Sequence, residues 1–149
     1  MKRLILALLT TAFILQLHAQ SEIYAPKGTA INGFDVVAFF HESKPVMGTD
    51  EFSYSYKNAT WLFSSKENRE AFADAPEKYA PQYGGWCAYG NSQGHKAPTQ
   101  ADTWTIANDK LYFNYNKKVK EMWSQDQQRL IEVADEKWPT VKLSKEINV

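Results

Sequence analysis

The chain has 149 residues, with 17 basic and 17 acidic side chains, 44% hydrophobic residues and a single cysteine. Its balanced charge argues against nucleic acid as a partner, because binding phosphates requires a basic face. The length suits one compact domain. One cysteine cannot form an intrachain disulfide, so buried aromatic side chains must stabilise the fold.

The first 20 residues have the pattern of a secretory signal peptide. Lys2 and Arg3 precede the apolar run Leu4–Leu17, and Ala19 is a small residue suited to a cleavage site. This run is shorter than the ~20 residues that span a membrane. Without residues 1–20, 15 basic side chains face 17 acidic ones, a net charge of −2. We expect an exported protein, periplasmic or secreted, with no membrane span after cleavage, a domain over residues 21–139 and a C-terminal tail over 140–149.

Alternating aromatic and polar residues predict two β-hairpins. Phe52, Tyr54 and Tyr56 alternate with polar residues, and after a turn at Asn58-Ala59 residues 60–63 return as the partner strand. Residues 104–106 and 111–115 repeat this arrangement around a turn at Asn108-Asp109. Asp35–Phe40 is a continuous apolar run that we interpret as a short β-rich segment.

Two regions have helical signals. Ser64 and Glu67 match a capping box, which predicts a helix from Ser64 to about Ala73. Asn116 is expected to cap a C-terminal helical region that ends at Trp138-Pro139 and is followed by a frayed tail. Polar residues 124–128 leave open whether this region is one helix or two. The order of elements predicts an α+β fold, with a small antiparallel sheet built from two hairpins and helices packed against it.

Cys87 is the residue whose chemistry matters most, and it lies in the segment Tyr83–Gly90, rich in glycine and aromatic residues. Exported proteins usually carry paired cysteines. A solitary one is a free thiol, an intermolecular partner, a metal ligand or a small buried hydrophobe.

Three further stretches are distinctive: Gly33–Phe40, Phe63–Phe72, and Pro76–Tyr89 with its Glu-Lys-Tyr-Ala-Pro-Gln-Tyr-Gly-Gly block. Through them the segment from Ile31 to Trp138 resembles the exported branch of the YHS-domain family, in which some relatives are described as selenoproteins. The resemblance implies metal handling, since the short YHS domains are regarded as heavy-metal binders because of their cysteines.

The cysteines of the short form are absent from this chain. Ala38 stands where the short form has the cysteine of Asp-Pro-Val-Cys. Ser64 and Asn68 stand in place of the two others. In this branch the cysteine has effectively moved to Cys87, and selenium at that position in relatives would favour redox or soft-metal chemistry there.

The residues support three hypotheses, none requiring an enzyme. In the first, the protein is an accessory that binds or handles a metal ion, copper(I) or zinc, with Cys87, His95 and His41 as ligands, because both metals accept thiolate and imidazole. The second is a thiol redox protein, with His95 or Lys96 lowering the pKa of Cys87. The third is a non-catalytic module that binds a small ligand or a protein through Trp86, Tyr89 and Tyr83, with Cys87 inert in the core.

Overall fold

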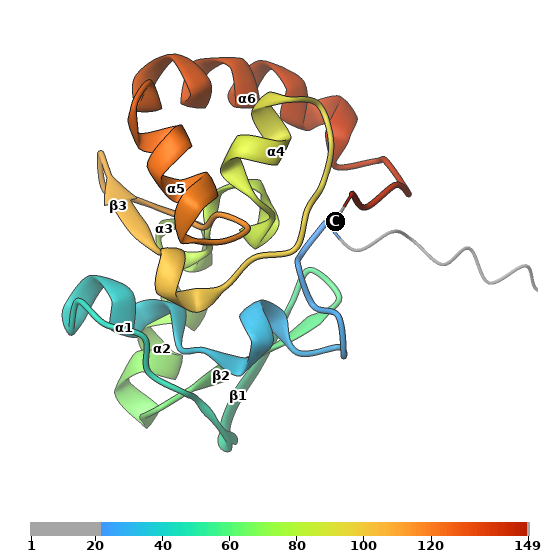
Figure 1. The fold of residues 1–149 in the computed structure, drawn as a ribbon. Coiled ribbons are helices and arrows are strands. Elements are labelled where there is room, and N and C mark those ends of the chain that lie inside the picture. The colour runs from blue at the N-terminus through green and yellow to red at the C-terminus, as the bar shows by residue number, and fades with distance from the viewer. Residues whose placement is uncertain (1–21, 149) are drawn as a thin grey trace, which may run out of the picture.

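The computed structural model describes residues 22–148, so the expected signal peptide over 1–20 lies outside the described residues. In Figure 1 the first hairpin lies with α1 and α2 in one half of the molecule, and α4, α5 and α6 form the other half. The strands are β1 (Thr49–Tyr56), β2 (Ala59–Phe63), β3 (Thr105–Ala107) and β4 (Lys110–Tyr112). The helices are α1 (Val36–His41), α2 (Lys66–Asp74), α3 (Pro76–Tyr79), α4 (Ala88–Ser92), α5 (Lys117–Ser124) and α6 (Gln127–Val141), and short helical turns lie at η1 (Ala30–Gly33), η2 (Gln82–Gly85) and η3 (Ala101–Thr103).

Both predicted hairpins are confirmed, and the fold is α+β. β1 pairs antiparallel with β2, and β3 with β4. The first turn is Lys57-Asn58, one residue earlier than the expected Asn58-Ala59, because Ala59 already belongs to β2, and the second is Asn108-Asp109 as expected. Both residues of each turn have positive φ, which matches the right-handed twist of the strands. The hairpins form two separate two-stranded sheets, not the single sheet expected.

The run Asp35–Phe40 forms helix α1, so the β-rich interpretation was wrong. Asp35 is the N-cap, and its Oδ1 accepts hydrogen bonds from the backbone N–H groups of Val37 at 2.9 Å and Ala38 at 3.2 Å. Four of the six residues of α1 are buried. A fully buried helix has a continuous apolar sequence, just as a buried strand does, so periodicity cannot separate the two.

Helix α2 starts one residue later than predicted. The N-cap is Ser65, whose Oγ accepts from the backbone N–H of Asn68 at 3.1 Å. Ser64 instead donates its hydroxyl to Oδ2 of Asp35 at 2.7 Å. With two adjacent serines available, a tertiary contact decides which of them caps the helix.

The C-terminal region forms two helices, and Asn116 caps α5 as predicted, accepting from the N–H of Val119 at 2.9 Å. Helix α6 continues past Pro139 to Val141. Within the expected tail, the carbonyls of Lys142 and Ser144 accept from the ammonium of Lys96, at 2.9 Å and 3.2 Å.

The interior consists of two hydrophobic clusters, one in each half of the molecule. The hairpin core lies around the first hairpin, α1 and α2, and includes Trp61 and Phe72. The helical core lies among α4, α5 and α6 and includes Trp123 and Ile131. Trp138 on α6 packs against both clusters.

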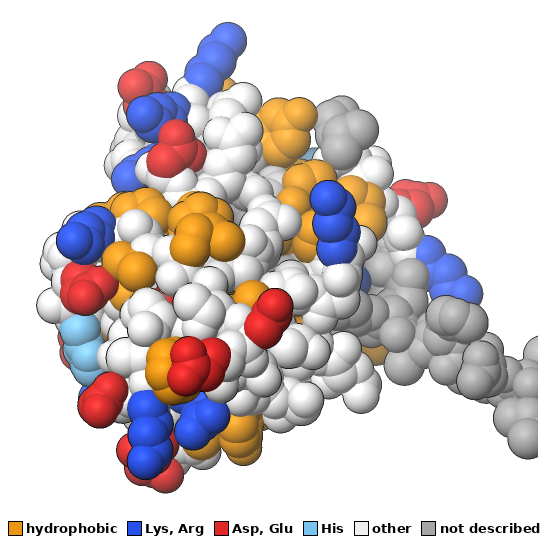
Figure 2. All heavy atoms as spheres, turned by 90° about the horizontal axis from the view of Figure 1, so that it is seen from below, with side chains coloured by type: hydrophobic (Ala, Val, Ile, Leu, Met, Phe, Trp, Pro, Cys, Tyr) orange, Lys and Arg blue, Asp and Glu red, His pale blue; other side chains and the backbone are white. Residues whose placement is uncertain are grey.

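On the surface seen from below, acidic and basic side chains are intermingled, with hydrophobic side chains between them (Figure 2). Within residues 22–148, no helix has the length and apolar character needed to cross a membrane.

Candidate functional site

Cys87 lies where several segments converge, at the N-cap of α4. It follows a turn in which Tyr83, Gly84 and Gly85 all have positive φ. Glycine is required at position 84, because a Cβ there would lie 1.8 Å from the carbonyl oxygen of Glu22. The N–H of Cys87 then donates to the carbonyl of Ala97 at 3.0 Å, which fixes the sulfur between α4 and the residues after β4.

The sulfur of Cys87 is surrounded by hydrogen-bonding groups although the residue is only 1% exposed. Sγ accepts from the backbone N–H groups of Gly90 at 3.4 Å and Tyr115 at 3.3 Å. The thiol donates toward Oδ1 of Asn114 at 3.6 Å, and the same oxygen accepts from the N–H of Tyr89 at 3.1 Å. Sequence reasoning missed Asn114, which follows β4 with no pattern to mark it.

Burial raises the pKa of the Cys87 thiol, and the surrounding backbone N–H groups oppose this by favouring the thiolate. Because the pKa is raised overall, the thiol stays protonated at neutral pH. A reactive cysteine has a lowered pKa, so this direction speaks against the thiol redox hypothesis.

A cavity of about 270 Å³ brings Cys87 and His95 together. The half-buried imidazole of His95 rests on Gly90, where an added Cβ would lie 3.1 Å from Cε1 and 3.3 Å from Nδ1. Nδ1 also lies 3.3 Å from the carbonyl oxygen of Lys96. Asn148, near the end of the described chain, is part of the cavity wall.

The structure does not bring His41 to this cavity. His41 is exposed at the end of α1, with its ring edge-on to Tyr79 at a centroid distance of 5.8 Å. Over residues 22–148 no group of three or more His, Cys, Asp or Glu side chains could hold a metal ion. Cys87 and His95 are therefore the pair that the fold unites.

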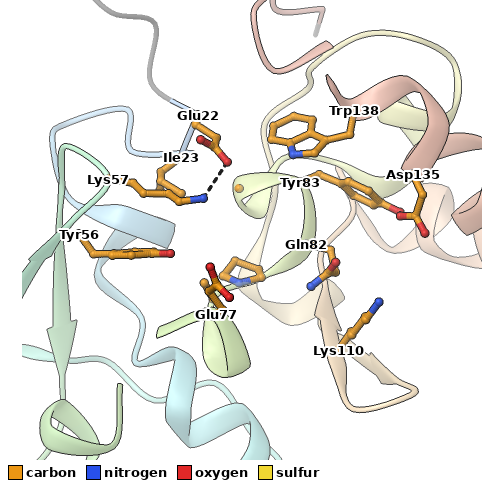
Figure 3. A pocket seen from close by; sticks show the side chains of 13 residues that line it. Glu22, Ile23, Tyr56, Lys57, Glu77, Gln82, Tyr83, Lys110, Asp135 and Trp138 are labelled. Carbon is orange, nitrogen blue, oxygen red and sulfur yellow. Dashed lines mark hydrogen bonds and ion pairs between the residues drawn. The ribbon is translucent and has the colours of Figure 1, made fainter. Parts of the chain in front are cut away.

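The three aromatic residues expected to bind a ligand line different cavities. Tyr89 borders the cavity of Cys87 and another beside α6. Trp86 borders a cavity between the two ends of the described chain. Tyr83 borders the cavity of about 440 Å³ drawn in Figure 3.

In the cavity of Figure 3, Tyr83 and Trp138 face Lys57 and Glu22 across the opening. The hydroxyl of Tyr83 donates to Oδ1 of Asp135 at 2.9 Å. Lys57 donates to Oε1 of Glu22 at 2.9 Å. Burial, together with the hydrogen bond to Asp135, raises the pKa of Tyr83, so the phenol stays neutral and keeps donating.

A second polar cluster surrounds Asp35, which is completely buried. Its Oδ2 accepts from the N–H of Ser64 at 2.9 Å, from the hydroxyl of Ser64 at 2.7 Å and from Nδ2 of Asn68 at 2.8 Å. Its Oδ1 accepts from the N–H groups of Val37 and Ala38. Ala38, Ser64 and Asn68 thus converge on this one carboxylate.

Comparison with known proteins finds a family match over part of the chain. Residues 37–83 match the family model of the YHS domain, a segment that runs from α1 through the first hairpin to η2. No curated protein and no solved structure gives a significant match. Cys87 and His95 lie just beyond the matched segment.

Proposed function

We propose that this YHS-domain protein binds copper(I) as cargo after export, with Cys87 and His95 as its ligands. The observation that carries the proposal is that the sulfur and the imidazole line one cavity although eight residues separate them in the chain. The general association of YHS domains with metal handling supports the same function.

The choice of copper(I) over zinc follows from the number of donors. A structural zinc site has four protein ligands and a catalytic one has three. The described residues offer no group of three His, Cys, Asp or Glu side chains. Copper(I) favours soft thiolate donors and also accepts imidazole, and it is stable with only two ligands. His41 has no part in this site.

The environment of the sulfur is suited to a thiolate once a metal replaces its proton. The N–H groups of Gly90 and Tyr115 already donate to Sγ and would stabilise negative charge there. Because the ligand must lose its proton, binding releases one proton and strengthens as pH rises. The burial of Cys87 would limit the contact of its sulfur with water.

Competition with a chromophoric copper(I) chelator under anaerobic, reducing conditions tests the proposal. We expect the mature wild-type chain to take up one copper(I) ion, and Cys87→Ser to take up none. His95→Gln should weaken binding by about tenfold or more, since even outer-shell partners of metal ligands have effects of that size.

His41→Gln is the matched control, and we expect it to bind as the wild type does. Circular dichroism confirms that each variant is folded. Copper(I) binding of wild-type affinity in Cys87→Ser would overturn the proposal.

A further inference from the structure

A cavity of about 310 Å³ lies between the first and the last described segments, and it shares no lining residue with the cavity of Cys87. Its wall is mostly apolar and includes the Tyr24–Trp86 ring pair, whose centroids are 5.0 Å apart. Of the residues between 22 and 148 that line it, the charged ones are Lys96 and Lys145, and none is Asp or Glu. The cavity therefore combines an apolar body with positive charge.

Lys96 supplies a buried ammonium. The residue is only 2% exposed, and Nζ donates to the carbonyls of Lys142 and Ser144. Nζ also lies 5.4 Å from the centroid of the Trp86 ring, a cation–π distance. An ammonium has three N–H donors, so one remains beyond the two carbonyl bonds.

Among the described residues, no carboxylate forms an ion pair with this ammonium. Glu22 acts on it electrostatically, but the side chain of Glu22 is hydrogen-bonded to Lys57 at 2.9 Å. Buried charges are usually paired, because a lone one loses its hydration without compensation.

We propose that this cavity binds a small amphipathic carboxylate, with its apolar body against Tyr24 and Trp86 and its carboxylate attracted by Lys96 and Lys145. Within the apolar wall, the attraction between unlike charges is stronger than in water. The volume falls at the lower end of the range of small-molecule sites. The proposal is independent of copper binding, since neither Cys87 nor His95 lines this cavity.

Titration with three probes of equal chain length, octanoate, octanol and octylammonium, tests the proposal by calorimetry and by the fluorescence of tryptophan. We expect octanoate to bind at least about tenfold more tightly than octanol, a difference typical of one favourable charged contact. Octylammonium should bind more weakly than octanol. Equal binding of octanoate and octanol would overturn the proposal.

Two kinds of variant locate the site. Lys145→Gln removes an exposed charge, so the fold should be unaffected, and octanoate should bind a few-fold more weakly while octanol is unchanged. Ile147→Trp should fill the cavity and abolish binding of octanoate without removing a charge.

Lys137→Gln, on α6 and outside the cavity lining, is the charge-matched control and should bind octanoate as the wild type does. If Lys137→Gln and Lys145→Gln weaken octanoate binding equally, or if Ile147→Trp still binds it, the assignment to this cavity is wrong.

Discussion

The imidazole of His95 rests directly on the α-carbon of Gly90. A side chain at position 90 would come within 3.1 Å of Cε1, and the N–H of the same glycine donates to Sγ of Cys87 at 3.4 Å. Gly90 therefore positions both proposed copper ligands. It lies inside α4, where alanine is the better helix former.

Gly90→Ala should consequently separate function from stability. We expect copper(I) affinity to fall by up to about tenfold, because the imidazole is displaced from the sulfur. The melting temperature should change little, because the better helix propensity of alanine opposes the crowding of its Cβ against His95. In the background of His95→Gln, the alanine should have no further effect on copper(I) affinity, and a double-mutant cycle measures this coupling. Additive losses would show that Gly90 acts in some other way.

The buried thiol should make stability depend on alkaline pH. Because burial raises the pKa of Cys87 in the folded chain, the unfolded thiol loses its proton first as pH rises. The contribution to stability is complete below the unfolded pKa of ~8.5 and is lost as pH rises through the folded value.

Urea unfolding of wild type and Cys87→Ser at about pH 7 and about pH 10 measures this effect, because these values bracket the unfolded pKa of a thiol. Between these two pH values, the free energy of unfolding should fall more for the wild type than for Cys87→Ser. All other titrating groups are the same in both proteins, so the difference reports on Cys87. A parallel fall in both proteins would contradict the raised pKa.

The carboxylate of Asp35 should be a major source of stability. Asp35→Asn replaces an acceptor that serves five donated hydrogen bonds. We expect a loss of about 3 kcal/mol or more in the free energy of unfolding, since each unsatisfied buried group costs roughly 1–3 kcal/mol. Urea unfolding measures this. Asp109→Asn, exposed in the second hairpin turn, is the control and should change stability little.

The tail after α6 should restrict access to Cys87. Asn148 lines the cavity of the thiol, and its N–H donates to the carbonyl of Lys96 at 2.9 Å. Deleting residues 142–149 should therefore raise the rate of alkylation of Cys87 by iodoacetamide. An increase of about tenfold would correspond to ~1.4 kcal/mol of lost local protection.

Lys96→Met should raise the alkylation rate in the same direction, because it removes the two hydrogen bonds from the ammonium to the tail. Leu143→Ser keeps these contacts and should react at the wild-type rate. An unchanged rate in the deleted chain would show that the tail does not cover the thiol.

Sequence patterns predicted the elements that are determined by interactions between residues close in sequence. The hairpins follow from alternation and from turn residues that tolerate positive φ, such as Asn58 and Asn108. Asn116 was recognisable as a cap because its short side chain can accept a hydrogen bond from a free N–H group of the first helical turn. The failures at Asp35–Phe40 and at Ser64 both involve the buried carboxylate of Asp35. It caps α1 and also binds Ser64, and neither contact is visible as a period in the sequence.

The candidate site was predictable only as a set of residue types. Cys87 and His95 could be singled out because few side chains are soft metal ligands. That Cys87 and His95 line one cavity, and that His41 does not, depends on the tertiary fold, including the turn before α4. Asn114 and Gly90 have no distinguishing residue type or spacing, so only the three-dimensional arrangement reveals them.

Trp138 has a consequence for how the molecule comes apart. It packs against both the hairpin core and the helical core, so its indole links the two halves of the interior. If the two halves separate before either unfolds, the amides of α6 near this ring should take up deuterium when they separate. The amides of β2 should then exchange later.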